Sequence, residues 1–268
     1  MRFEYHILAT THIDQNRYKL TKEALEKANV QIKEYYIPGI NDHDPRNPPI
    51  GRIESGRVIE LDDGEWGLEV ELAIFEEGDE KVPYLNGKKL VPEIENPEKF
   101  KVMYDISYDN PEGKELIKKL TLISGEEPSL GIKRGPDPIS ILIIIFGFVG
   151  INIAIGFLRK LGANAADALQ KTLDEYFKGK SDNDRLIQWS VTKDVNGNPV
   201  EIWIIATNPK KDSIKKFFET GLGNIDDELL EYDIPSNISR VVFKYEKGKL
   251  SQMYSVRADG FPIQLKKK

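Results

Sequence analysis

One uncharged run, Ile139–Leu158, constrains the fold of this chain more than any other feature of its sequence. A run of this kind has to be withdrawn from water, either into a lipid bilayer or into a protein core. As a helix rising about 1.5 Å per residue, it would be roughly 30 Å long, which matches the hydrocarbon thickness of a bilayer. Pro138 suits the first position of such a helix. We therefore expect a central apolar helix that spans a membrane.

Small residues recur within this run. They would let a second helix approach closely, which favours helix association in a membrane. The sequence thus predicts a membrane-associated protein, with a lipid bilayer as one partner and a homo-oligomer as a further expectation. The residues expected to pack against the second helix are Gly147, Gly150, Ala154 and Gly156.

A second interpretation of the run is burial in a protein core. Ile141–Ile145 consists of large aliphatic residues, mostly β-branched, which are typical of strands. A strand followed by a helix, with the break at Gly147 or Gly150, would bury the same residues in a water-soluble protein. The membrane orientation also stays open, because residues 118–138 and 159–179 each contain four Lys or Arg.

Composition excludes several classes of function. The chain has no cysteine, which rules out disulfides, thiolate nucleophiles and cysteine–zinc sites and is compatible with the cytoplasm. Its net charge is −6, and residues 1–135 carry 19 basic against 27 acidic side chains. No nucleic-acid partner is expected, because phosphate binding needs clustered Lys and Arg.

The residues before the apolar run predict a β-rich domain over 1–135. Phe3–Ala9 has the pattern of a strand, and Thr21 is suited to cap a short helix. Arg52–Leu61 and Trp66–Phe75 alternate apolar and polar residues on either side of an Asp-Gly turn, which predicts a hairpin.

The residues after the run predict an amphipathic helix at Arg159–Phe177 and then a small domain. Asn196-Gly197 and Lys247-Gly248 are each flanked by strand-like segments, and Asp212 is suited to cap a helix between the two hairpins. We therefore expect an α+β fold in three parts. These are the β-rich domain at 1–135, an apolar helix followed by an amphipathic helix at 136–180, and a ββαββ domain at 181–268.

His43 is the first candidate for chemistry, because it lies between Asp42 and Asp44. A neighbouring carboxylate can orient the imidazole and raise its pKa, as a general base requires. The other interpretation is a loop histidine bonded to these two acids. No metal site or cofactor is expected, since adjacent residues of an extended loop point in alternating directions and no second histidine has a matching spacing.

A series of motifs extends over about the first 75 residues: an acidic residue, a short helix, a His-Asp loop, a Gly-Arg strand start and a Gly-Leu hairpin. They lie at Asp14, Leu20–Leu25, His43-Asp44, Pro49–Arg52 and Gly67-Leu68. The series resembles the opening of the phage prohead (head maturation) proteases. The resemblance implies a serine protease in which His43 is the base. The nucleophile would then be Ser107, on a strand-like segment, or Ser129, two residues before Gly131.

Three functions remain open from the sequence. The first is a membrane-associated, non-enzymatic protein, a sensor or effector, whose water-facing domains flank a self-associating apolar helix. The second is a prohead-type serine protease that uses His43 with Ser107 or Ser129. The third is a soluble binding or structural module in which the apolar segment is buried.

Overall fold

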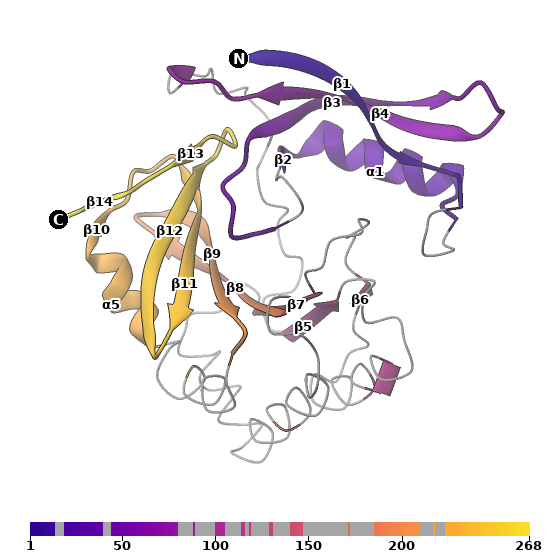
Figure 1. Cartoon of the computed structure of the whole chain (residues 1–268). Coiled ribbons are helices and arrows are strands. Elements are labelled where there is room, and N and C mark those ends of the chain that lie inside the picture. Colours follow the sequence, from indigo (N-terminus) through magenta and orange to yellow (C-terminus); the bar gives the residue numbers. More distant parts are fainter. Residues whose placement is uncertain are drawn as a thin grey trace. The chain divides into compact units, whose positions relative to one another are not determined.

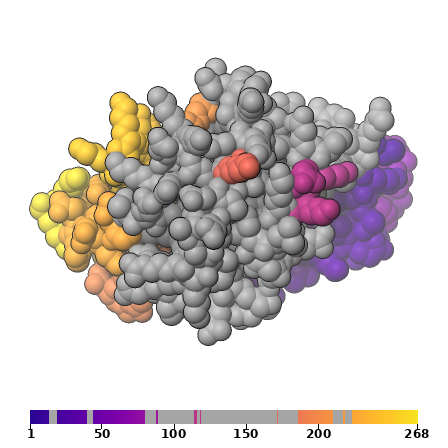
Figure 2. Space-filling model, turned by 90° about the horizontal axis from the view of Figure 1, so that it is seen from below, coloured from indigo at the N-terminus to yellow at the C-terminus, as the bar shows by residue number. Residues whose placement is uncertain are grey.

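The computed structural model describes thirteen parts of the chain. These are residues 1–13, 19–39, 44–79, 88, 100–104, 114–115, 118, 129–130, 140–146, 171, 185–209, 217 and 223–268. Figure 2 shows the chain in space-filling form, with all other residues in grey. The chain divides into two compact units, which are described separately below. Unit 1 comprises Met1–Asn41, Asn47–Glu93 and Val256–Ile263, and unit 2 comprises Asp42–Arg46, Ile94–Ser255 and Gln264–Lys268.

Unit 1 contains a four-stranded sheet with the order β1-β4-β3-β2, in which all neighbours are antiparallel (Figure 1). The strands are β1 (Arg2–Thr10), β2 (Ile37–Gly39), β3 (Gly51–Glu60) and β4 (Trp66–Ile74). The predicted strand at Phe3–Ala9 and the predicted hairpin at Arg52–Phe75 are confirmed. Gly64 has a φ of +84° in the hairpin turn, a conformation that glycine adopts without strain.

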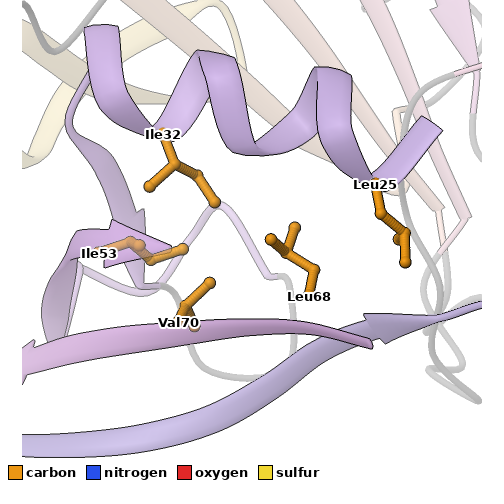
Figure 3. Close-up of a cluster of buried hydrophobic side chains, with 5 residues drawn as sticks. All are labelled: Leu25, Ile32, Ile53, Leu68 and Val70. Atoms are coloured by element: carbon orange, nitrogen blue, oxygen red, sulfur yellow. The ribbon is translucent and has the colours of Figure 1, made fainter. Parts of the chain in front are cut away.

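Helix α1 (Lys22–Glu34) covers one face of this sheet. Its predicted cap is confirmed, because the Thr21 side chain accepts a hydrogen bond from the backbone N–H of Ala24. Figure 3 shows the helix directing Leu25 and Ile32 towards the strands. The core between helix and sheet consists of Leu25, Ile32, Ile53, Leu68 and Val70.

A second sheet has eight strands in the order β13-β12-β11-β9-β8-β7-β5-β6. Helix α5 (Asn224–Leu230) and a two-stranded ladder of β10 (Tyr232–Asp233) and β14 (Lys266–Lys267) complete the described elements. The strands of the large sheet are β5 (Phe100–Tyr104), β6 (Ser129–Leu130), β7 (Ser140–Phe146), β8 (Arg185–Val195), β9 (Asn198–Thr207), β11 (Ile238–Glu246), β12 (Lys249–Arg257) and β13 (Pro262–Ile263).

The two hairpins predicted in the C-terminal part are confirmed. Asn196 and Gly197 have φ values of 56° and 81°, and Lys247 and Gly248 have 52° and 83°. Two successive positive φ values form the tight turn whose twist matches that of paired strands. The helix predicted after Asp212 lies almost wholly outside the described residues.

A cluster of aromatic side chains lies within the otherwise largely aliphatic core of unit 2. The ring of Trp189 stacks on that of Phe217 with a centroid distance of 4.0 Å, and Tyr245 packs edge-on against Phe217 at 5.0 Å. Burial raises the pKa of the Tyr245 hydroxyl. Ile225 and Leu229 are the buried residues of α5.

The predicted central apolar helix is wrong. The first part of the run forms strand β7, which pairs in parallel with β8 and antiparallel with β5. A strand that is buried on both faces of its sheet has a continuous hydrophobic sequence, so a run such as Ile141–Ile145 is as compatible with a strand as with a membrane helix. Among the described residues, no helix is both long enough and apolar enough to cross a membrane. The expectation of a transmembrane helix is therefore withdrawn.

The fold class is corrected accordingly, since the described part of the chain is mainly β and not α+β around a central helix. Gly147, Gly150, Ala154 and Gly156 lie outside the described residues, as does all of the predicted amphipathic helix except Lys171. The three-part division at 1–135, 136–180 and 181–268 stays a prediction, because most of its middle part is not described.

Candidate binding edge of the N-terminal sheet

Strand β1 forms an edge of the sheet in unit 1. Within the described ranges it pairs with β4 alone, through eight of its nine residues from Arg2 to Thr10. An edge strand has one row of backbone N–H and C=O groups directed away from its neighbour, and a further strand can pair with that row. β1 therefore offers a backbone template for an added strand.

The side chains of this edge are unusually apolar. Phe3, Tyr5, Ile7 and Leu8 are 54%, 65%, 44% and 51% exposed. Lysines, prolines or a short length often protect edge strands, and β1 has none of these three; its protection is limited to the charges of Arg2 and Glu4 and to a β-bulge at Leu8. A row of exposed aromatic and aliphatic side chains on a long edge is typical of an interaction surface.

Three of these side chains share one face of the sheet. Phe3, Tyr5 and Ile7 lie opposite Ala73, Glu71 and Glu69 of β4, in that order. Leu68 and Val70, which belong to the helix-covered core, alternate with these β4 residues and so point to the other face. Phe3, Tyr5 and Ile7 therefore lie on the face of the sheet opposite α1, which contacts β3 and β4.

A polar network on the same face holds Tyr5 in place. The Tyr5 hydroxyl donates a 3.0 Å hydrogen bond to the carboxylate of Glu71, which also accepts a 3.2 Å hydrogen bond from Ser55. The bond to Glu71 raises the pKa of Tyr5, because loss of the hydroxyl proton would place two negative charges side by side. Beside this network, the Arg57 guanidinium donates to Glu69 at 2.6 Å. The charged groups next to the apolar row are thus already paired within the chain.

A β-bulge ends the regular part of the strand. The pairing of β1 with β4 shifts between Ile7 and Ala9, which leaves Leu8 as the extra residue. A bulge increases the local twist and interrupts a regular ladder. The segment Arg2–Ile7 is therefore the part of the edge that can pair regularly with a further strand.

A hydroxyl, an imidazole and a carboxylate lie in a row beyond the bulge. Thr10 Oγ1 is 3.1 Å from His12 Nδ1, and His12 Nε2 is 2.6 Å from Asp63 Oδ2. The bond from His12 lowers the pKa of Asp63. The side chains of His12 and Asp63 are both about half exposed. Contact with water weakens an exposed ion pair. The main role of the His12–Asp63 pair is therefore to connect the residues after β1 to the β3–β4 turn.

Next to this row, Glu65 carries a second set of contacts. It accepts hydrogen bonds from the Thr11 hydroxyl and from Lys19, the latter at 2.7 Å. These bonds lower the pKa of Glu65, with that from Lys19 contributing most. They too connect the chain after β1 to the turn.

The catalytic residues predicted from the sequence are only partly located. His43 and Ser107 lie outside the described residues. Ser129 is on β6, opposite Met103 of β5. The structure therefore does not test whether the histidine meets either serine.

The segment directly after His43 is anchored within unit 2. Asp44 is buried and forms a two-point ion pair with Arg46, with Nε–Oδ1 and Nη2–Oδ2 distances of 2.8 and 2.6 Å. The Tyr254 hydroxyl donates a 2.8 Å hydrogen bond to the carbonyl of Pro45. Asp44 thus forms an ion pair with Arg46, and the predicted bond between His43 and this carboxylate lies outside the described residues.

Sequence reasoning missed the edge of β1. The alternation of Phe3, Tyr5 and Ile7 with Arg2, Glu4 and His6 was readable as a strand with one apolar face. That pattern does not reveal whether the apolar face is covered or whether the strand has one neighbour or two.

Within the described part of the chain, no three acidic or histidine side chains converge as they would around a metal ion. Comparison with family models, with curated proteins and with solved structures gave no match to this chain. The resemblance to prohead proteases therefore stays a prediction.

Proposed function

We propose that this chain is a binding module that captures an extended protein segment on the edge of β1. One observation carries the proposal: a nine-residue edge strand presents four large apolar side chains to solvent. In this mode of recognition, backbone hydrogen bonds supply affinity, while contacts to alternate side chains supply specificity.

The chemistry of the edge defines the segment that it would bind. Phe3, Tyr5 and Ile7 form an apolar row along one face, so the bound strand should place apolar side chains on that face at every second position. Because Glu71 and Glu69 are already hydrogen-bonded to Tyr5 and Arg57, the edge adds no unpaired charge to the interface. An alternating apolar and polar strand fits this surface best.

The test uses a fluorescein-labelled peptide of alternating valine and threonine, whose anisotropy reports binding to the full chain. Ile7→Lys should weaken binding about tenfold or more, because it removes apolar contact area and adds a charge to the edge. The new lysine would lie opposite Glu69, so the sheet itself should be retained.

Val30→Lys is the matched control, since Val30 is an exposed apolar residue on α1, away from β1. It should bind the peptide as the wild type does. Equal binding by both variants, or no binding by a wild type that is monomeric at the concentration used, would contradict the proposal.

A second candidate is the prohead-type serine protease. It is supported by the anchoring of Asp44, Pro45 and Arg46, which restrains the backbone directly after His43. A fluorophosphonate probe should then label the wild type. It should fail to label His43→Ala and should also fail to label one of the two serine variants, Ser107→Ala or Ser129→Ala. Ser55→Ala is the control, because Ser55 contacts Glu71 on the sheet of unit 1. Labelling that is the same in all variants would remove this candidate.

A further inference from the structure

We infer that the segment bound by β1 is β1 of a second copy of this chain, paired antiparallel about a two-fold axis at Tyr5. This inference rests on the proposed function and names its partner. Two four-stranded sheets would then join into one continuous sheet across the two copies. A two-fold interface of this kind is closed, so assembly would stop at a dimer.

The regular part of the strand limits where the axis can lie. The bulge at Leu8 restricts regular pairing to Arg2–Ile7. An axis at Tyr5 pairs the five residues Phe3–Ile7 with the same segment of the second copy, and an axis at Glu4 would pair Arg2–His6 equally well. With the axis at Tyr5, Phe3 of each copy lies opposite Ile7 of the other.

Charge complementarity selects between these registers. Within one strand, Glu4 already contacts Arg2 at 2.8 Å and His6 at 3.0 Å. With the axis at Tyr5, Glu4 of one copy also lies opposite His6 of the other, and the symmetry adds this acid–imidazole pair twice. An axis at Glu4 would instead oppose two Glu4 carboxylates, which is destabilising on a sheet. An axis at His6 would oppose two imidazoles, which do not attract each other. Only the register centred on Tyr5 pairs groups that attract each other.

The apolar side chains agree with this arrangement. Phe3, Tyr5 and Ile7 of both copies would lie on one face of the joined sheet, the face opposite α1. Cross-strand aromatic and β-branched pairs are among the favourable neighbours on a sheet. The pairing would therefore bring the exposed Phe3, Tyr5 and Ile7 side chains of the two copies next to one another.

A cysteine scan tests the register directly, because the natural chain has no cysteine. In Tyr5→Cys, the two thiols would face each other across the axis, with a Cα–Cα distance of about 5.5 Å, which a disulfide spans. Copper-phenanthroline oxidation should convert this variant to a covalent dimer at least about tenfold faster than Val30→Cys, since the latter thiol would lie on α1 away from the edge. Equal rates for the two variants would overturn the inference.

A charge exchange tests the Glu4–His6 pairing by sedimentation equilibrium of the full chain over a concentration series. The wild type should show a monomer–dimer equilibrium. Glu4→Lys alone would place a lysine opposite His6, and His6→Glu alone would place two carboxylates opposite each other. Each change should therefore weaken dimerisation. The double variant should restore the dimer, since an acid again faces a base. Val30→Lys should dimerise as the wild type does.

The two experiments separate this inference from the proposed function. A wild type that binds the valine–threonine peptide but stays monomeric at every concentration would overturn self-pairing and leave the binding module in place. A wild type that neither binds the peptide nor dimerises would overturn both. Failure of the double variant to recover would overturn the register.

Discussion

At the scale of single residues, Tyr254 shows how burial changes the chemistry of one group in this protein. Its side chain is buried, and its hydroxyl donates to the carbonyl of Pro45. Burial raises the pKa of Tyr254 to about 12, because the phenolate would lose its hydration; Arg240 opposes this shift in part and Asp44 adds to it. One residue thereby links the segment after His43 to the pH dependence of stability.

The direction of that pH dependence follows from the raised pKa. In the unfolded chain a tyrosine ionises near pH 10. Between pH 10 and about 12 the unfolded chain therefore releases a proton that folded Tyr254 retains. The stabilisation from this group is complete below pH 10 and is lost as the pH rises through about 12.

Urea unfolding at pH 8 and pH 11 tests this effect. Between pH 8 and pH 11, the free energy of unfolding of the wild type should fall by about 1.4 kcal/mol more than that of Tyr254→Phe. Comparing the two proteins cancels the contributions of Tyr232 and Tyr245, whose pKa values burial also raises. At pH 8 the variant itself should be about 1 kcal/mol less stable, because the hydrogen bond to Pro45 is lost. The same pH dependence in both proteins would contradict the assignment.

At the scale of elements, the pairing of β3 with β4 depends on a close backbone approach. Gly51 begins β3 and lies opposite Ile74. A Cβ atom at Gly51 would overlap the carbonyl of Ala73, which belongs to the backbone of β4 and cannot rotate away. A glycine in a strand often marks such an approach.

Gly51→Ala should therefore lower the free energy of unfolding by about 3 kcal/mol, the upper end of the usual cost of an overpacked site. Gly64→Ala is the matched control. Gly64 has a positive φ with open space around it, so only the backbone conformation is strained, at a cost of about 1 kcal/mol. Chemical denaturation followed by circular dichroism measures both values. A Gly51 variant as stable as the Gly64 variant would show that β4 shifts freely.

At the scale of the whole molecule, the position of β7 within the large sheet decides how the most apolar segment of the chain is accommodated. Ile143 lies opposite Met103 of β5 and Gln188 of β8, which are separated from it in sequence by 40 and 45 residues. Neighbouring strands on both sides provide hydrogen-bond partners for the backbone of β7. This arrangement predicts that the strand is intolerant of any residue without a backbone N–H.

Ile143→Pro should lower the free energy of unfolding by about 3 kcal/mol or more, because proline removes a donor in the middle of a sheet. Ile143→Val, which keeps the backbone N–H, is the matched control and should be destabilised much less. In a Trp66→Phe background, the fluorescence of Trp189 and Trp203, on β8 and β9, reports unfolding of this sheet during a urea titration. An unchanged midpoint for the proline variant would contradict the placement of β7 between two strands.

The sequence alone determined the local structure of this protein. The Asn196-Gly197 and Lys247-Gly248 turns, the Thr21 cap and the β3–β4 hairpin were predictable, because each depends on the φ, ψ and side-chain preferences of a few adjacent residues. The tertiary structure alone decided that Ser140–Phe146 is a strand and that β1 is an edge. Burial of an aliphatic run satisfies the hydrophobic effect in a helix or in a sheet, and the choice depends on backbone partners that are distant in the chain. The candidate binding edge was hidden from sequence analysis for the same reason, since the number of neighbours of a strand is a property of the whole sheet.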